Sequence, residues 1–163
     1  MSTVKRRSQK QEKSVAKDFN ARPTVASGAL WGMKGDVRNN KFLIECKTTE
    51  KDYYSITTKV WEKIEDEALK DRMRTPLLII DLQDTDRYVV FNPNQFIRQV
   101  NTYEVAPHVH GGCKSYRFKG YTQEDLPILF SVIPLKSKKK NHILMVMKMT
   151  EFEDFFEKEL KEE

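Results

Sequence analysis

The chain has 163 residues, of which 33% are charged and 39% hydrophobic, with a formal net charge of +5 at pH 7. This length favours one compact domain over residues 1–163 with room for a hydrophobic core. No apolar run is long enough to cross a membrane and no apolar segment follows the basic N-terminus, which argues against the membrane and signal-peptide classes. Two cysteines form no disulfide framework, so we expect an intracellular protein, in the cytoplasm or nucleoid of a bacterial or archaeal host.

The charge is unevenly distributed along the chain. Residues 150–163 hold seven acidic residues and two lysines, a local charge of −5, so the total of +5 leaves +10 for residues 1–149. A basic body favours a polyanionic partner, with nucleic acid ahead of an acidic membrane surface. Ordinary solubilising charge is the alternative that composition leaves open.

A first helix is expected from about Ser8 to Asn20, after a frayed basic N-terminus. Val15, Ala16 and Phe19 form its apolar side, and Glu12 falls on or beside that side. An unpaired carboxylate is costly there, and a cation or a metal-bound water would relieve the cost. The alternative is a surface glutamate paired with a nearby lysine.

The chain then leaves the helix at Pro23, since proline disfavours helical backbone in the residue before it. Thr24 to Ala26 favour a first strand. The approach that follows contains Gly28 and Gly32, whose backbone freedom would let this segment lie close to a DNA strand.

The stretch 35–47 predicts a β-hairpin. Asn39 and Asn40 tolerate the backbone that a two-residue hairpin loop requires. In that register Asp36 pairs with Leu43, and residues that alternate along the second strand share the face of Asp36.

Asp36, Glu45 and Lys47 therefore form a compact group, with the two carboxylates diagonal to each other at roughly 7 Å or less. Such a pair suits Mg²⁺, with Mn²⁺ as a substitute, because a hard ion takes its other oxygen ligands from water and substrate phosphate. The ion would activate water and neutralise phosphoryl charge, and Lys47 would position the water or stabilise developing negative charge. The alternative is a hairpin edge whose charges only prevent aggregation.

These residues carry a family resemblance. Gly-Asp-Val at 35–37, nine residues from Asp36 to Glu45, and Glu45-Cys46-Lys47 after an apolar run resemble the PD-(D/E)XK nuclease superfamily. A helix with a glutamate, then Ala-Ser-Gly, Gly-Asp-Val and Ile-Glu-x-Lys-Thr, is most similar to archaeal-type Holliday-junction resolvases and their phage relatives, over about residues 5–92. Lys34-Gly35 departs from the pattern, since many members have proline before the aspartate.

The resemblance implies a role for each matching residue. Asp36 and Glu45 would bind the metal, Glu12 would join them through water, and the Cys46 main-chain carbonyl would be a further ligand. Lys47 would assist the attacking water, and Ser27 would lie by the scissile phosphate. Symmetric cleavage of a four-way junction needs two active sites, so a homodimer is expected. Its interface residues are sought among Trp31, Trp61 and the C-terminal phenylalanines.

The middle of the chain predicts a β–α–β unit. A helix over about 56–74, with Ser55 as its N-cap, precedes the apolar run 77–82, which reads as a strand buried on both faces. A crossover helix between strands 41–47 and 77–82 makes these strands parallel. The order of elements matches the αβββαβ core of the resembled superfamily.

We therefore expect an α/β protein with a restriction-endonuclease-like αβββαβ core at about 8–92, and a mixed central sheet flanked by helices. Residues 93–163 would form a C-terminal extension. It comprises a short helix from Asn92, strands at 126–135 and 142–149, and a helix at 150–161.

The function expected is a metal-dependent endodeoxyribonuclease, most like a Holliday-junction resolvase of phage or mobile-element type. The expected DNA contacts are basic side chains on the N-terminus, both early helices, the hairpin approach and a lysine-rich turn: Arg6, Arg7, Lys13, Lys34, Lys59, Lys138, Lys139 and Lys140. Three alternatives stay open: a repair, restriction or recombination nuclease on duplex, flap or single-stranded DNA; a non-catalytic DNA-binding or assembly protein; and an RNA nuclease, because no module here recognises a 2′-hydroxyl.

Overall fold

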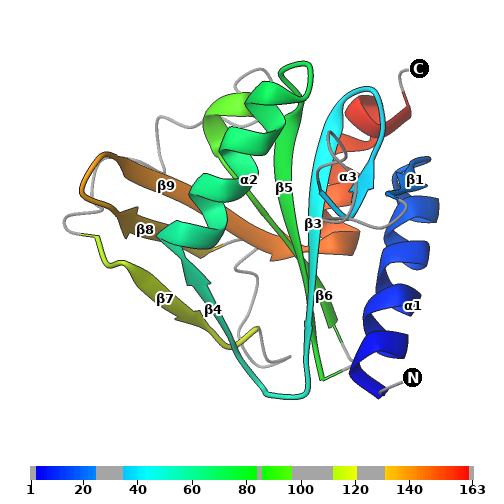
Figure 1. Cartoon of the computed structure of the whole chain (residues 1–163), viewed down its shortest axis with the longest axis horizontal. Coiled ribbons are helices and arrows are strands. Elements are labelled where there is room, and N and C mark those ends of the chain that lie inside the picture. Colours follow the sequence, from blue (N-terminus) through cyan, green and yellow to red (C-terminus); the bar gives the residue numbers. More distant parts are fainter. Residues whose placement is uncertain (1–2, 25–34, 84–85, 97–111, 121–130, 162–163) are drawn as a thin grey trace.

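A computed structural model describes residues 3–24, 35–83, 86–96, 112–120 and 131–161 of the chain. It is an α/β structure built on a mixed seven-stranded sheet in the order β1-β2-β3-β5-β6-β9-β8 (Figure 1). The strands of this sheet, in spatial order, are β1 (Arg22–Pro23), β2 (Val37–Arg38), β3 (Phe42–Thr49), β5 (Thr75–Leu82), β6 (Asp86–Phe91), β9 (Asn141–Lys148) and β8 (Ser131–Lys136). The expected α/β class with a mixed central sheet is confirmed.

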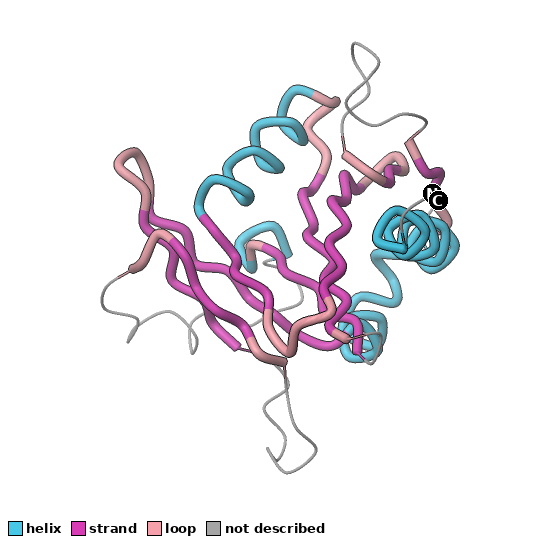
Figure 2. The backbone as a smooth tube through the Cα atoms, turned by 60° about the horizontal axis from the view of Figure 1, so that its bottom comes forward, coloured by secondary structure: helices cyan, strands magenta, loops and turns pink. Residues whose placement is uncertain are grey.

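Helices cover both faces of this sheet, as Figure 2 shows. The helices α1 (Thr3–Asp18) and α3 (Met149–Lys161) pack on one face, and α2 (Thr58–Lys70) packs on the other. On the first face the core includes Phe19, which directly follows α1, Phe152 and Phe156 of α3 and the β3 residue Ile44. On the second it includes Trp61 of α2. No helix in the described ranges is long and apolar enough to cross a membrane.

The predicted β–α–β unit is confirmed. β3 and β5 are parallel neighbours, with Ile44 opposite Leu77 and Cys46 opposite Ile79. The run Leu77–Ile80 is fully buried because helices lie over both faces of the sheet at this point. A parallel neighbour requires a crossover, and α2 supplies it.

The β2–β3 hairpin has a different register from the expected one. Arg38 pairs with Leu43 and Val37 with Ile44, so four residues rather than two separate the innermost pair. The reason is Asn39, whose Oδ1 accepts hydrogen bonds from the Lys41 and Phe42 N–H groups at 2.9 and 2.7 Å. This side-chain turn replaces the predicted two-residue loop.

Both early helices begin at residues other than those predicted. α1 already starts at Thr3, so the segment expected to be frayed is helical. The N-cap of α2 is Thr57, whose Oγ1 accepts from the Val60 N–H at 3.2 Å, and the prediction of Ser55 was wrong. Ser55 instead belongs to β4 (Tyr54–Thr57), which pairs with β7 (Ser115–Phe118) in a small second sheet.

The C-terminal part contains the expected strand pair and helix, although residues 126–130 of the expected strand 126–135 lie outside the described residues. After a short 3-10 helix, η1 (Pro93–Phe96), β8 and β9 form a hairpin, β9 pairs with β6, and α3 follows directly. One sheet thus joins the expected core and its extension. Trp61, Phe152 and Phe156 are fully buried in the hydrophobic core, so the prediction that they supply a dimer interface was wrong; Trp31 lies outside the described residues.

Candidate metal and nucleic-acid site

Asp36 lies just before β2 and is attached to β3 by its backbone and its side chain. Its N–H donates to the Ile44 carbonyl at 2.9 Å, and its Oδ2 accepts from the Cys46 N–H at 2.8 Å. The β2–β3 ladder ends at the Val37–Ile44 pair, and Asp36 lies just outside it. The Asp36 carboxylate therefore lies against β3 at Cys46, the residue that follows Glu45.

Gly35 allows the backbone to turn so that Asp36 lies against β3. Its φ is +70°, a backbone conformation that residues other than glycine rarely adopt. A Cβ at Gly35 would also lie 2.8 Å from Leu43 Cδ1. The glycine before the aspartate is thus required by the local geometry.

Glu45 is a buried acid, 7% exposed, and it is paired with lysines. Lys47 Nζ lies 2.8 Å from Glu45 Oε1, and Lys63 Nζ on α2 lies 3.9 Å from the same oxygen. Lys59, which was expected to point toward the carboxylates, is exposed on α2. The sequence prediction missed Lys63, although it lies one helical turn beyond Lys59 and so on the same side of the helix.

The Lys47 side chain is held in its charged form. Burial alone would lower the pKa of Lys47, but the hydrogen bond and charge of Glu45, together with the charge of Asp36, raise that pKa above its ordinary value. Tyr54 on β4 adjoins this pair: burial raises the pKa of its phenol, Lys47 partly offsets this, and Glu45 raises it further. Lys47 can therefore donate hydrogen bonds near neutral pH but not accept a proton.

Glu12 reaches the same group from α1. Burial raises the pKa of Glu12, and the charges of Asp36 and Glu45 raise it further. The Ser8 hydroxyl donates a hydrogen bond to Glu12 Oε1 at 3.1 Å and lowers this pKa. The net pKa is above the ordinary value. The charges of two hairpin acids, Asp36 and Glu45, thus act on Glu12 of the first helix.

The neighbouring residue Gln11 was missed by the sequence analysis. It is 3% exposed, and its Nε2 donates to the Lys47 main-chain carbonyl at 2.9 Å. This contact attaches α1 to the end of β3. The signal was present, because Gln11 lies one turn before Val15 on the core-facing side of the helix.

Cys46 faces the opposite side of the sheet from Glu45. Burial, and then the charges of Asp36, Glu12 and Asp81, raise the pKa of its thiol well above the ordinary value, so the thiol stays neutral. Its N–H points to Asp36, and the carbonyl of a strand residue points to the same side as its N–H. That carbonyl is thus directed toward the carboxylates.

In the described part of the chain, no three histidine, cysteine or acidic side chains are grouped closely enough to hold one metal ion. Mg²⁺ does not require such a group, since one or two carboxylates with water and substrate phosphate satisfy it. Asp36 and Glu45 supply two. Both lysines approach Glu45 through Oε1, which leaves Oε2 for an ion.

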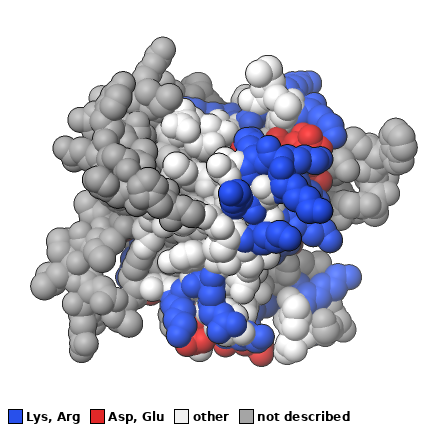
Figure 3. Space-filling view, turned by 90° about the vertical axis from the view of Figure 1, so that its left-hand side faces the viewer, with Lys and Arg blue, Asp and Glu red and all other residues white. Residues whose placement is uncertain are grey.

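The predicted DNA-contacting residues do not form one surface. Arg6, Arg7 and Lys13 lie on α1, whereas Lys138, Lys139 and Lys140 occupy the β8–β9 turn on the opposite side of Figure 1. Figure 3 shows Lys and Arg side chains gathered on the face that carries this turn. Lys140 pairs with Glu65 of α2 at 2.8 Å. Ser27 and Lys34 lie outside the described residues.

Comparison with known proteins adds no assignment to this geometry. No protein-family model matches the chain, and no curated protein matches it.

Proposed function

We propose that the protein is a metal-dependent endodeoxyribonuclease that hydrolyses DNA phosphodiester bonds at the Asp36–Glu45–Lys47 group. One observation carries this proposal: Glu45 is an acid only 7% exposed with a lysine 2.8 Å away, and burial, followed by the charges of Asp36 and Glu45, raises the pKa of nearby Glu12. Like charges gathered in this way are unfavourable without a cation. A hairpin edge that only prevents aggregation has no need to bury Glu45 or to bring a third acid from another element.

The donor set fits a hard divalent ion. Asp36, Glu45 Oε2 and the Cys46 carbonyl would hold Mg²⁺ or Mn²⁺, with Glu12 acting through water. When bound, the ion supplies a nucleophilic hydroxide and neutralises phosphoryl charge. Asp36 is positioned by the Cys46 N–H at 2.8 Å, and such oriented ligands bind an ion in a defined geometry.

Lys47 has a different role from the acids. Because the pKa of Lys47 is raised, its ammonium group remains protonated and can only donate hydrogen bonds. We assign it to orienting the attacking water and stabilising the negative charge that develops on the phosphoryl oxygens. Glu12, with its raised pKa, is the acid best placed to take a proton from water near neutral pH.

A four-way DNA junction is the substrate we propose, acted on by a homodimer. This assignment is supported by the motif order along residues 5–92 and by the basic charge of residues 1–149. The buried state of Trp61, Phe152 and Phe156 requires other residues to form the dimer interface.

The test uses labelled four-way junction, duplex, flap and single-stranded DNA with Mg²⁺ or EDTA. The proteins are the wild type, Glu45→Ala, Lys47→Ala and the charge-matched control Asp66→Asn, which alters an exposed carboxylate on α2. Symmetric junction nicking that needs Mg²⁺, is lost in the first two variants and persists in the control would support the proposal. Cleavage of another DNA form alone would keep the site and reject the junction as substrate.

A non-catalytic DNA-binding or assembly protein is the second candidate. The observation that favours it is the direct contact of Lys47 with Glu45, which already compensates the buried carboxylate. Binding of DNA without cleavage under any divalent ion, with Glu45→Ala binding normally, would select this candidate.

A further inference from the structure

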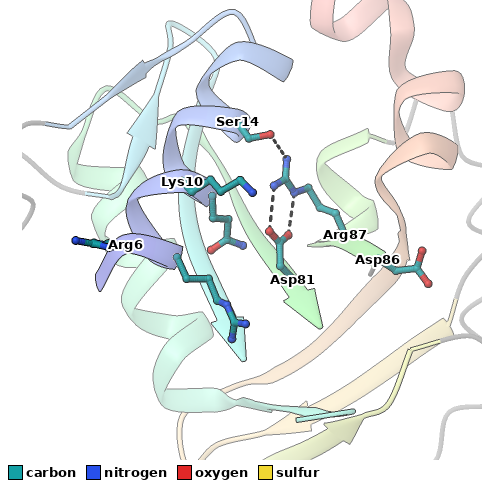
Figure 4. Close-up of a pocket in the computed structure, with 8 residues that line it drawn as sticks. Arg6, Lys10, Ser14, Asp81, Asp86 and Arg87 are labelled. Atoms are coloured by element: carbon teal, nitrogen blue, oxygen red, sulfur yellow. Dashed lines mark hydrogen bonds and ion pairs between the residues drawn. The ribbon is translucent and has the colours of Figure 1, made fainter. Parts of the chain in front are cut away.

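A pocket of about 580 Å³ opens beside α1, next to the end of β5 and the start of β6. Figure 4 shows Lys10 and Ser14 from the helix pointing toward Asp81 and Arg87 from the two strands, with Arg6 one turn before Lys10. Its volume falls within the range of roughly 300–1,000 Å³ that is typical of small-molecule sites. The pocket lies outside the carboxylate group, yet it shares one wall with it through α1.

Two basic side chains of this pocket have no ion-pair partner among the residues that the structure describes. Arg87 is compensated by Asp81 and Asp18, each at 2.8 Å, and the other basic group with a partner, Arg7, pairs with Glu50. Within the described residues, by contrast, no ion pair or side-chain hydrogen bond engages Arg6 or Lys10. These two side chains are one turn apart on α1, so they can approach a single anion together.

Gln11 adds a second, independent feature. It lines the same pocket and is 3% exposed, and its Oε1 is buried without a hydrogen-bond partner. The donor end of the amide is committed to the Lys47 carbonyl at 2.9 Å, so Oε1 must remain the acceptor. A buried acceptor without a donor is costly. A bare anion cannot relieve that cost, whereas a ligand with an N–H or O–H group can.

We propose that this pocket binds one nucleotide of the substrate strand. Arg6 and Lys10 contact its phosphate, and Gln11 Oε1 accepts a hydrogen bond from its base or sugar. The choice of a nucleic-acid strand rests on the proposed function. Gln11 precedes Glu12 and holds the main chain of Lys47, so the bound nucleotide lies next to the carboxylates and fixes which phosphate of the strand reaches them.

The test measures binding in EDTA, so that cleavage does not contribute. The full-length protein is titrated with a single-stranded oligonucleotide carrying a 5′-phosphate, with the same strand carrying a 5′-hydroxyl, and with a circular strand. Lys10→Gln is compared with Lys17→Gln, an exposed lysine of the same helix that does not line the pocket. Arg6→Gln provides a second pocket variant.

We expect Lys10→Gln and Arg6→Gln each to weaken binding by roughly three- to tenfold. Each should also reduce the slope of log K against log salt by about 0.7, the value for one phosphate contact on a single strand. Lys17→Gln should leave both quantities near wild type. Equal effects of Lys10→Gln and Lys17→Gln would overturn the proposal, since the helix would then attract DNA only through its overall charge.

The three strands identify the source of the phosphate. If the pocket holds a strand end, removal of the 5′-phosphate weakens wild-type binding and abolishes the effect of Lys10→Gln. If it holds an internal phosphate, the effect persists on the circular strand. Competition then tests Gln11: a nucleoside monophosphate should displace the strand at lower concentration than inorganic phosphate, and equal competition would overturn the nucleotide assignment.

These outcomes are separate from the fate of the proposed nuclease activity. If the protein cleaves no DNA but Lys10→Gln weakens binding more than Lys17→Gln, the pocket proposal is supported and the nuclease proposal is rejected. If the protein cleaves DNA but Lys10→Gln and Lys17→Gln bind equally well, the nuclease proposal is supported and the pocket proposal is rejected.

Discussion

Asp36 and Cys46 are joined across the β2–β3 hairpin, because the Asp36 carboxylate accepts a hydrogen bond from the Cys46 N–H at 2.8 Å, next to Glu45 in the chain. One acid is thus oriented by the backbone of the strand that carries the other. The spacing of nine residues between Asp36 and Glu45 matters for this reason. These residues include the whole β2–β3 loop, and the loop sets the register of the two strands.

Gly35→Ala tests that orientation. An alanine Cβ would lie 2.8 Å from Leu43 Cδ1 at a φ of +70°, so we expect a loss of about 1–2 kcal/mol in unfolding free energy. Displacement of Asp36 should also lower activity more than this loss of stability explains. The measurements are urea denaturation and cleavage rate at a temperature where the variant remains folded. A variant with normal stability and rate would show that the strained backbone is unimportant.

The effect of pH on stability tests the position of Glu12. Its pKa is raised in the folded state by burial and by Asp36 and Glu45, with Ser8 and Lys47 opposing. The folded protein therefore binds this proton more tightly than the unfolded chain, so stability falls as pH rises through the raised pKa. In EDTA, Glu12→Gln should be more resistant to urea than wild type at pH 7 and equal to it below pH 4, where Glu12 is protonated in both states.

Added Mg²⁺ should reduce this advantage of Glu12→Gln at pH 7, because an ion offsets the repulsion among the acids. Asp66→Asn, which alters an exposed acid paired with Lys70, serves as the control at each pH. An equal gain in both variants would mean that the net charge of the protein, and not the acidic group, sets the difference.

How much of the site follows from the sequence is clearest at the hairpin. The pairing of the two hairpin strands was predicted correctly, but their register differs by two residues from the predicted one. The loop itself escaped prediction because Asn39 also donates to the Phe19 carbonyl at 2.9 Å. That contact joins residues 20 positions apart, and no local pattern reveals it.

The helix α2 gives a similar lesson. Its apolar stepping and the buried strand after it predicted the crossover and the parallel pairing, since both depend on local periodicity. Its first residue was misplaced because Ser55 pairs with Arg117 of β7, a partner 62 positions away. Lys63 was missed for a related reason. The turn of α2 that lies beside Glu45 depends on the length of β4, which directly precedes the helix and was not predicted.

Lys63 provides a prediction of its own. Its ammonium group lies 3.9 Å from Glu45 Oε1 and competes with a metal ion for that carboxylate. Lys63→Gln should therefore lower the Mg²⁺ concentration needed for half-maximal binding by roughly two- to threefold, a small effect because Lys63 is 59% exposed and screened by solvent. Lys59→Gln, one turn earlier on the same helix, is the matched control, and an identical shift in both would indicate a general charge effect.

Lys47 should matter far more for activity than for stability. Among the described residues, Lys47→Met leaves Glu45 with only the more distant Lys63. We expect a stability loss of about 1 kcal/mol or less, since Lys47 is partly exposed and solvent screens the pair. Cleavage should fall by roughly a hundredfold or more, as for loss of a group that stabilises transition-state charge. Comparable small losses in both properties would make Lys47 a structural partner of Glu45.

The central claim is that Glu45 acts in metal-dependent hydrolysis of DNA. It is tested most directly by single-turnover cleavage of a labelled four-way junction at saturating protein, comparing wild type, Glu45→Gln and Asp66→Asn with Mg²⁺ or EDTA. The account predicts cleavage by wild type and Asp66→Asn with Mg²⁺ only, and none by Glu45→Gln although it still binds the junction. Cleavage by Glu45→Gln at the wild-type rate, or by wild type in EDTA, would contradict it.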